Sequence, residues 1–143
     1  MRSDYRTLLQ LLQRELKQQE RLLELLTKER VAVVKLKQDD IVKLAEAKES
    51  LLGEAKALEQ SRATVILELS GSDQPIKLRE LLGSCKELAL KRDLERVGGD
   101  LRKTTEATRE LHQTNAILLK QAMGIVATTT AILRSAPDTG LPS

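Results

Sequence analysis

Aromatic side chains are almost absent from this chain. Its 143 residues include no Phe, no Trp and a single Tyr, Tyr5. A compact globular core of this size normally uses several aromatic anchors, because each ring buries a large area. The core must therefore come from aliphatic side chains. A composition rich in Leu, Ala, Glu, Lys and Arg is typical of long helices and coiled coils.

Histidine and cysteine are equally scarce, with one residue of each. His112 has neither a cysteine neighbour nor a second histidine, so a zinc site or a Ser-His triad lacks its parts. Cys85 cannot form an internal disulfide, which fits a reducing cytoplasm. It falls on an apolar ladder, where a buried thiol behaves as a small hydrophobe. We therefore expect no enzyme activity, no metal and no other cofactor. A histidine-phosphotransfer module has only His112 to offer.

The chain also lacks a block of charge of one sign. It carries 24 basic and 21 acidic residues, interleaved, for a formal net charge of +3. Without a basic block, and with almost no aromatic rings on which bases could stack, no nucleic-acid partner is expected. Residues 1–16 show neither a continuous apolar core nor a small-residue cleavage site, so they do not resemble a secretory signal.

Leucines at helical spacing predict two long helices in the first half. One ladder runs from about Asp4 to Leu36, and a second runs to Leu69 with Lys48 and Arg62 as polar interruptions. The break at residues 37–40 is short, and Asp40 at its end is a natural N-cap. A short break between long helices predicts an antiparallel hairpin.

A third helical region follows the loop at residues 70–75, in which Asp73 is a plausible cap and Pro75 fits a first turn. Gly98-Gly99 costs this region about 2 kcal/mol relative to alanine, which predicts a kink, a frayed joint or a short break. The expected fold is all-α, an elongated bundle of three long helices. We expect one domain, residues 1–135, and a disordered tail, residues 136–143.

Charge is nearly lost toward the end of the third region. From Leu111 to Leu133 the only lysine, arginine, aspartate or glutamate is Lys120. We expect no membrane insertion, because the stretch is too short and too rich in threonine and glutamine to span a bilayer. Two interpretations remain open and compatible. The stretch is a buried helix packed between the arms of the hairpin, or it forms an open groove for a partner helix.

The order of three segments resembles the FlgN-like flagellar export chaperones. The first segment is a leucine-rich helix ending LLELLTKERVAVVK, the second is QDDIVKLAEAKESLL, and the third is ELHQTNAILLKQA. The positions that fit the family's patterns are Asp40, Lys48, Glu49, Leu111, Asn115, Ala116, Leu118 and Leu119. His112 departs from the pattern, since asparagine is common there, and Ala116 replaces a frequent glycine.

The resemblance implies a cytoplasmic chaperone of the flagellar type III export system. Such chaperones bind the C-terminal helical segments of hook-associated (hook–filament junction) proteins, keep them monomeric and deliver them to the export gate. Gate and ATPase components are further partners that it implies. Client binding in the family is associated with the C-terminal helix. Gate docking in some members uses an aromatic residue near the C-terminus, and this chain has none after Tyr5.

Our leading hypothesis is a chaperone that holds a client helix against residues 111–133. The rival is a structural coiled-coil protein, a homo-oligomer that self-associates through the same apolar faces. Size measurement would separate the two. The predicted partner-binding residues are Leu111, Asn115, Leu118, Leu119, Ala122, Met123, Ile125, Val126, Thr129 and Ile132.

Overall fold

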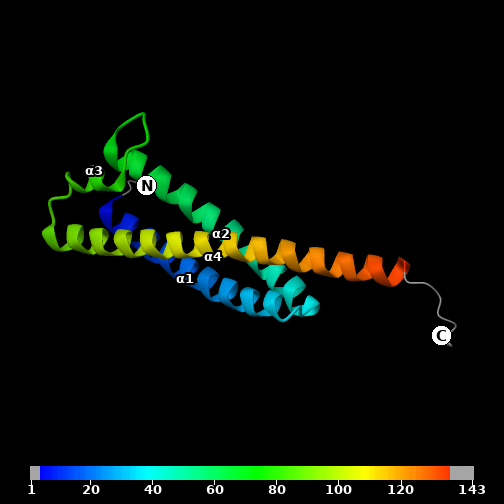
Figure 1. Ribbon diagram of the computed structural model, residues 1–143. Coiled ribbons are helices and arrows are strands. Elements are labelled where there is room, and N and C mark those ends of the chain that lie inside the picture. Colours follow the sequence, from blue (N-terminus) through cyan, green and yellow to red (C-terminus); the bar gives the residue numbers. More distant parts are fainter. Residues whose placement is uncertain (1–3, 136–143) are drawn as a thin grey trace.

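The computed structural model describes residues 4–135, and all regular structure in this range is helical. The elements are α1 (Tyr5–Val34), α2 (Gln38–Ser70), α3 (Leu78–Leu82) and α4 (Leu88–Ser135) (Figure 1). The predicted all-α fold with three long helices is confirmed, with the short α3 as an addition. The predicted disordered tail, residues 136–143, lies outside the described residues.

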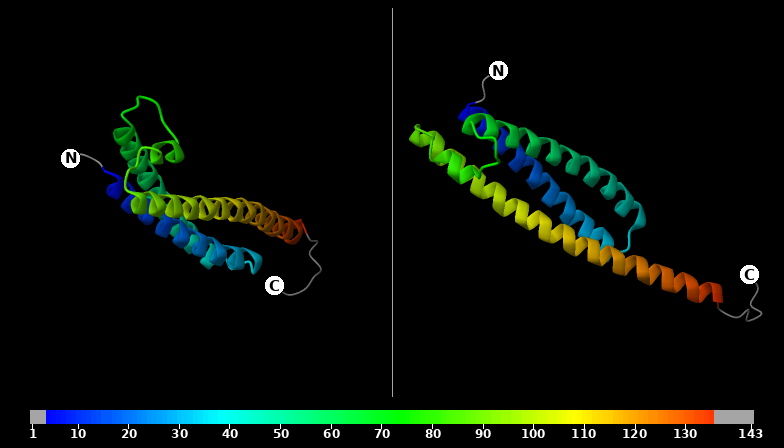
Figure 2. Two further views of the ribbon diagram at one scale, coloured as in Figure 1. Left: turned by 90° about the vertical axis from the view of Figure 1, so that its left-hand side faces the viewer. Right: turned by 90° about the horizontal axis from the view of Figure 1, so that it is seen from above.

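Helices α1 and α2 form the predicted hairpin (Figure 2). Asp4 caps α1: its carboxylate accepts the backbone N–H of Thr7 at 2.8 Å, which satisfies a free donor of the first turn. The predicted cap of α2 is wrong. The helix begins at Gln38, with Lys37 in the cap position and no side-chain capping bond. Asp40 instead lies inside the first turn, where its charge still favours the helix dipole.

The loop after α2 is confirmed. Gly71 ends α2 with φ 63°, in the left-handed region that glycine adopts without a side-chain clash. The predicted roles of Asp73 and Pro75 are wrong, since both are exposed loop residues and α3 begins only at Leu78.

The third helical region is interrupted at residues 83–87, and not at Gly98-Gly99 as expected. Helix α4 runs unbroken through both glycines for 48 residues, and Figure 1 shows no kink there. Tertiary packing explains the difference. A Cβ atom at Gly98 would lie 2.9 Å from the Cδ2 atom of Leu78, so the missing side chain lets α3 approach α4 closely. Cys85 lies half-buried in the 83–87 connection, and not on a helical ladder.

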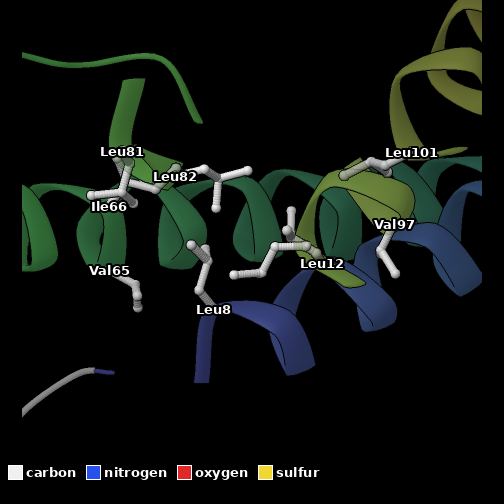
Figure 3. Close-up of a cluster of buried hydrophobic side chains, with 9 residues drawn as sticks. Leu8, Leu12, Val65, Ile66, Leu81, Leu82, Val97 and Leu101 are labelled. Carbon is white, nitrogen blue, oxygen red and sulfur yellow. The ribbon is translucent and has the colours of Figure 1, made fainter. Parts of the chain in front are cut away.

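Helix α1 lies in the middle of the molecule. It packs against α2 on one side and α4 on the other, whereas α2 and α4 do not pack against each other along the described chain (Figure 2). The apolar core lies at one end of the molecule, where α3 joins the long helices (Figure 3). Its members are Leu8, Leu12, Val65, Ile66, Leu81, Leu82, Leu94, Val97 and Leu101.

Candidate client-binding surface

Helices α1 and α4 run in the same direction with a constant register. The Thr108 hydroxyl donates to the Gln19 side chain at 2.8 Å, and the Asn115 amide donates to the Leu26 carbonyl at 2.8 Å. Both pairs are 89 residues apart. An unchanged offset places Val33, near the end of α1, level with Ala122. The α4 face turned to α1 is buried at every seventh residue, which is the repeat of a coiled-coil seam. These residues are Leu94, Leu101, Thr108, Asn115 and Ala122.

A polar junction joins three helices where α1 approaches its end. Asn115 is only 1% exposed, and its amide also donates to Oε1 of Glu29 at 3.0 Å. The other carboxylate oxygen of Glu29 accepts the Lys48 ammonium of α2 at 2.8 Å. Two positions of the family pattern, Lys48 and Asn115, therefore meet on one buried glutamate. We call Glu29, Lys48 and Asn115 the polar junction.

A second buried carboxylate links α1 to α2. Glu15 is 7% exposed, and its Oε1 accepts the Nε of Arg62 at 2.7 Å. Burial raises the pKa of the Glu15 carboxyl, because the charged form loses its hydration, and Arg62 opposes part of that shift. Gln18 makes a further link across the hairpin by donating to the Leu51 carbonyl. Between the apolar core and the polar junction, these polar links therefore accompany the buried Leu22 and Leu26 of α1.

The predicted partner-binding residues fall into two groups. In the first half of the charge-poor stretch, Asn115 and Ala122 are buried, and Leu111, Leu118 and Leu119 are half-buried. This half packs on α1 alone, and not between the arms of the hairpin as one interpretation required. Asn115 therefore makes an internal contact in the free chain. The partner-binding role of all ten residues stays a prediction.

The second group lies past the end of α1. We call residues 123–135 the overhang, and Figures 1 and 2 show this last part of α4 projecting beyond the hairpin. Thr129 is exposed, and the large apolar side chains of the overhang expose between 39% and 72% of their surface. They are Met123, Ile125, Val126, Ile132 and Leu133. Exposed apolar side chains gathered on one segment are typical of surfaces that bind proteins or membranes.

The α1–α4 seam continues into the overhang without a partner. Following the same heptad positions, Ile125, Thr129 and Ile132 succeed Leu118 and Ala122, yet α1 has already ended. A partner helix that continued the line of α1 would bury them.

The apolar part of α4 is also long enough and apolar enough to cross a membrane by length and composition. The expectation that the stretch is too short for this was therefore wrong. One such helix does not by itself indicate a membrane protein, although only 6% of its apolar window is buried, unlike the core helix of a soluble protein.

Groups suited to catalysis or metal binding do not gather on this surface. His112 is exposed on α4. Within residues 4–135, no three His, Cys, Asp or Glu side chains are placed to hold a metal ion. The overhang instead presents exposed apolar side chains.

Comparison with known proteins gives one family result. The family model described as FlgN protein matches residues 1–141 of this chain. Searches of the curated proteins and of the solved structures return no match.

Proposed function

Because the chain belongs to the FlgN protein family, a family of flagellar export chaperones, we propose which clients it carries and where it holds them. It binds the C-terminal helical segments of hook–filament junction proteins in the cytoplasm. It keeps these segments from assembling early and delivers them to the flagellar type III export apparatus. The function is binding and delivery, with no catalytic step.

The main support for this proposal is that the α1–α4 seam continues along α4 after α1 has ended. An amphipathic client helix laid along the overhang would take the place that α1 leaves, with apolar residues against Ile125 and Ile132 and a small or polar residue against Thr129. The overhang has 13 residues and is about 20 Å long. It offers room for roughly four helical turns of client.

The apolar surface that the overhang can bury limits how tightly it can bind a client by itself. Its five large apolar side chains expose about as much surface as three free side chains. At about 1.5 to 3 kcal/mol for each fully buried side chain, covering them contributes about 4 to 9 kcal/mol. Association itself costs roughly 4 to 15 kcal/mol. The overhang therefore supports weak capture, and tight capture needs a second contact.

Titration calorimetry tests this assignment. The full chain should bind purified C-terminal segments of the source cell's junction proteins, and a double variant, Ile125→Ser with Ile132→Ser, should lose most of that binding. Leu88→Ser is the matched control, because Leu88 is 61% exposed at the opposite end of α4. Undiminished binding by the double variant would overturn the assignment. A tight homo-oligomer with no capacity for client would favour the coiled-coil rival.

A further inference from the structure

The turn of the α1–α2 hairpin carries an exposed apolar cluster that the fold does not use. Val31, Val34, Leu36 and Val42 expose 49%, 66%, 47% and 58% of their surface. We call these four residues the tip. We propose that the tip is the second half of the client site. A partner helix with an apolar stripe bordered by acidic residues would rest in the corner between the tip and the overhang. This inference rests on the proposed function.

The backbone at Leu36 points to a role for its side chain. Leu36 has φ 54°, the one non-glycine residue with positive φ in the described chain. The turn is closed by backbone bonds, from Lys37 N–H to the Ala32 carbonyl at 2.9 Å and from Leu36 N–H to the Val33 carbonyl at 3.1 Å. Glycine would fit this conformation at less cost. A leucine here is strained and half-exposed, so folding of the turn does not account for it.

The helix register brings the tip to the base of the overhang. With the offset of 89 residues that relates Gln19 to Thr108 and Leu26 to Asn115, Val34 at the end of α1 falls level with Met123, the first residue of the overhang. Figures 1 and 2 agree, since in each view the hairpin turn lies beside the part of α4 where the overhang begins. A helix that continues the α1–α4 seam would therefore start against the tip and run along the overhang. The client helix would therefore lie along the same face of α4 that α1 contacts.

Charge around this corner is mainly basic. Residues 111–135 contain no aspartate or glutamate. Near the tip, Lys28 and Lys48 are paired with Glu24 and Glu29. In residues 28–43 and 120–135, the basic residues that make no ion pair within the described chain are Arg30, Lys35, Lys37, Lys43, Lys120 and Arg134. The acids close to the tip that also lack such a pair are Asp39 and Asp40. The excess of positive charge favours a partner whose apolar stripe has acidic borders.

Two substitutions at Leu36 separate the contribution of its apolar side chain to binding from the effect of its backbone conformation. Leu36→Gly and Leu36→Asn both suit the left-handed conformation and both remove the apolar group. Each should weaken binding of a junction-protein C-terminal segment about 5-fold, as expected for losing roughly half the burial of one leucine. Leu88→Asn, the same exchange at a similarly exposed leucine far from the corner, should leave the affinity unchanged. Thermal unfolding should place both Leu36 variants within a few degrees of the unaltered protein.

Charge-reversal variants test whether the partner helix carries acidic residues. The double variant Lys35→Glu with Lys37→Glu should weaken binding several-fold at low salt, and the loss should shrink as salt is added. Unchanged affinity in both Leu36 variants, with binding still lost on substitution of Ile125 and Ile132, would overturn the tip proposal and leave the proposed function standing. No binding of junction-protein segments by the unaltered chain would instead overturn the proposed function.

Two other occupants of the corner are outcomes of the same test. Vesicles of phosphatidylethanolamine and phosphatidylglycerol that bind the unaltered chain and compete with the client segment, with weaker binding in the Leu36 variants, would assign the corner to a membrane surface. Dimerisation in sedimentation runs that is lost in the same variants would assign it to a second copy. Either result contradicts the proposal.

Discussion

Substituting Asn115 by alanine tests whether the polar junction fixes the place where α4 leaves the hairpin. The Asn115 amide donates one hydrogen bond to the Leu26 carbonyl and one to the Glu29 carboxylate, at 2.8 and 3.0 Å. Asn115→Ala removes both bonds. Among the described residues, Glu29 then keeps only Lys48 as a side-chain partner, although the Glu29 residue is 2% exposed.

The expected cost follows from these contacts. A hydrogen bond to a charged group contributes about 1.5 to 3 kcal/mol, and a neutral one about 0.5 to 1.5 kcal/mol. Asn115 also buries its Oδ1 without a partner, and removing that atom returns about 1 to 3 kcal/mol. At the middle of these ranges the two bonds contribute about 3 kcal/mol and the removed Oδ1 returns about 2 kcal/mol, so the balance is a loss of about 1 kcal/mol in the free energy of unfolding. The loss should be local, because the apolar core lies at the other end of the molecule.

Amide hydrogen exchange measures that local effect. In Asn115→Ala, residues 111–122 should exchange about fivefold faster, while residues 94–101 keep their protection. Gln113→Ala is the control, since Gln113 is exposed on the same turn of α4 and should change little. Equal protection of residues 111–122 in Asn115→Ala and in the control would refute the role given to the junction.

Further predictions concern the glycine pair, the buried carboxylate and the histidine. Gly99→Ala should stabilise the protein by about 1 kcal/mol in urea unfolding, because nothing lies within 4 Å of its Cβ position, whereas Gly98→Ala should gain less because its Cβ meets Leu78 at 2.9 Å. A destabilised Gly99→Ala would contradict the open space there. Burial raises the pKa of Glu15, so the folded state binds that proton more readily, and its contribution to stability falls as pH rises above about 4.5. Above about pH 4.5, the stability of Glu15→Gln relative to the unaltered protein should therefore increase with pH. A relative stability that decreases with pH would be inconsistent with the burial effect. His112→Ala should leave client binding intact by calorimetry, and lost binding with an intact fold would revive a role for the imidazole.

Periodicity and turn chemistry were sufficient to predict the hairpin and the loop that follows it. They did not locate the break in the third region, because Leu81, Leu82, Cys85 and Leu88 keep helical spacing across residues 83–87. Local propensity also placed a joint at Gly98-Gly99. Packing of α3 on that surface outweighs the intrinsic cost of two glycines, and this contact between distant segments leaves no local pattern.

The ion-pair partners of the two buried glutamates could not be identified from the sequence. Glu15 and Glu29 look like solvated positions of a charged helix, and their partners lie 47 and 19 residues away. A signal was nevertheless present, since Arg62 and Lys48 interrupt the apolar ladder of α2. A cation on an apolar face predicts a carboxylate opposite. The pairing itself depends on the hairpin register, which the tertiary fold sets.

The overhang was predicted in composition but not in position. Loss of charge over residues 111–133 indicated an apolar helix, yet no local pattern states where α1 ends relative to α4. That point depends on the parallel register, which follows from α3 and the two connections around it. The register divides the stretch into a packed half and an exposed half.

Hydrogen exchange of the full chain with and without a bound junction-protein C-terminal segment shows whether the overhang is where a client lies. If a client helix lies along the overhang, the bound segment should add protection at residues 123–135, with a smaller gain at residues 31–42. Added protection confined to α2 or to residues 88–110, with the overhang unchanged, would contradict this placement.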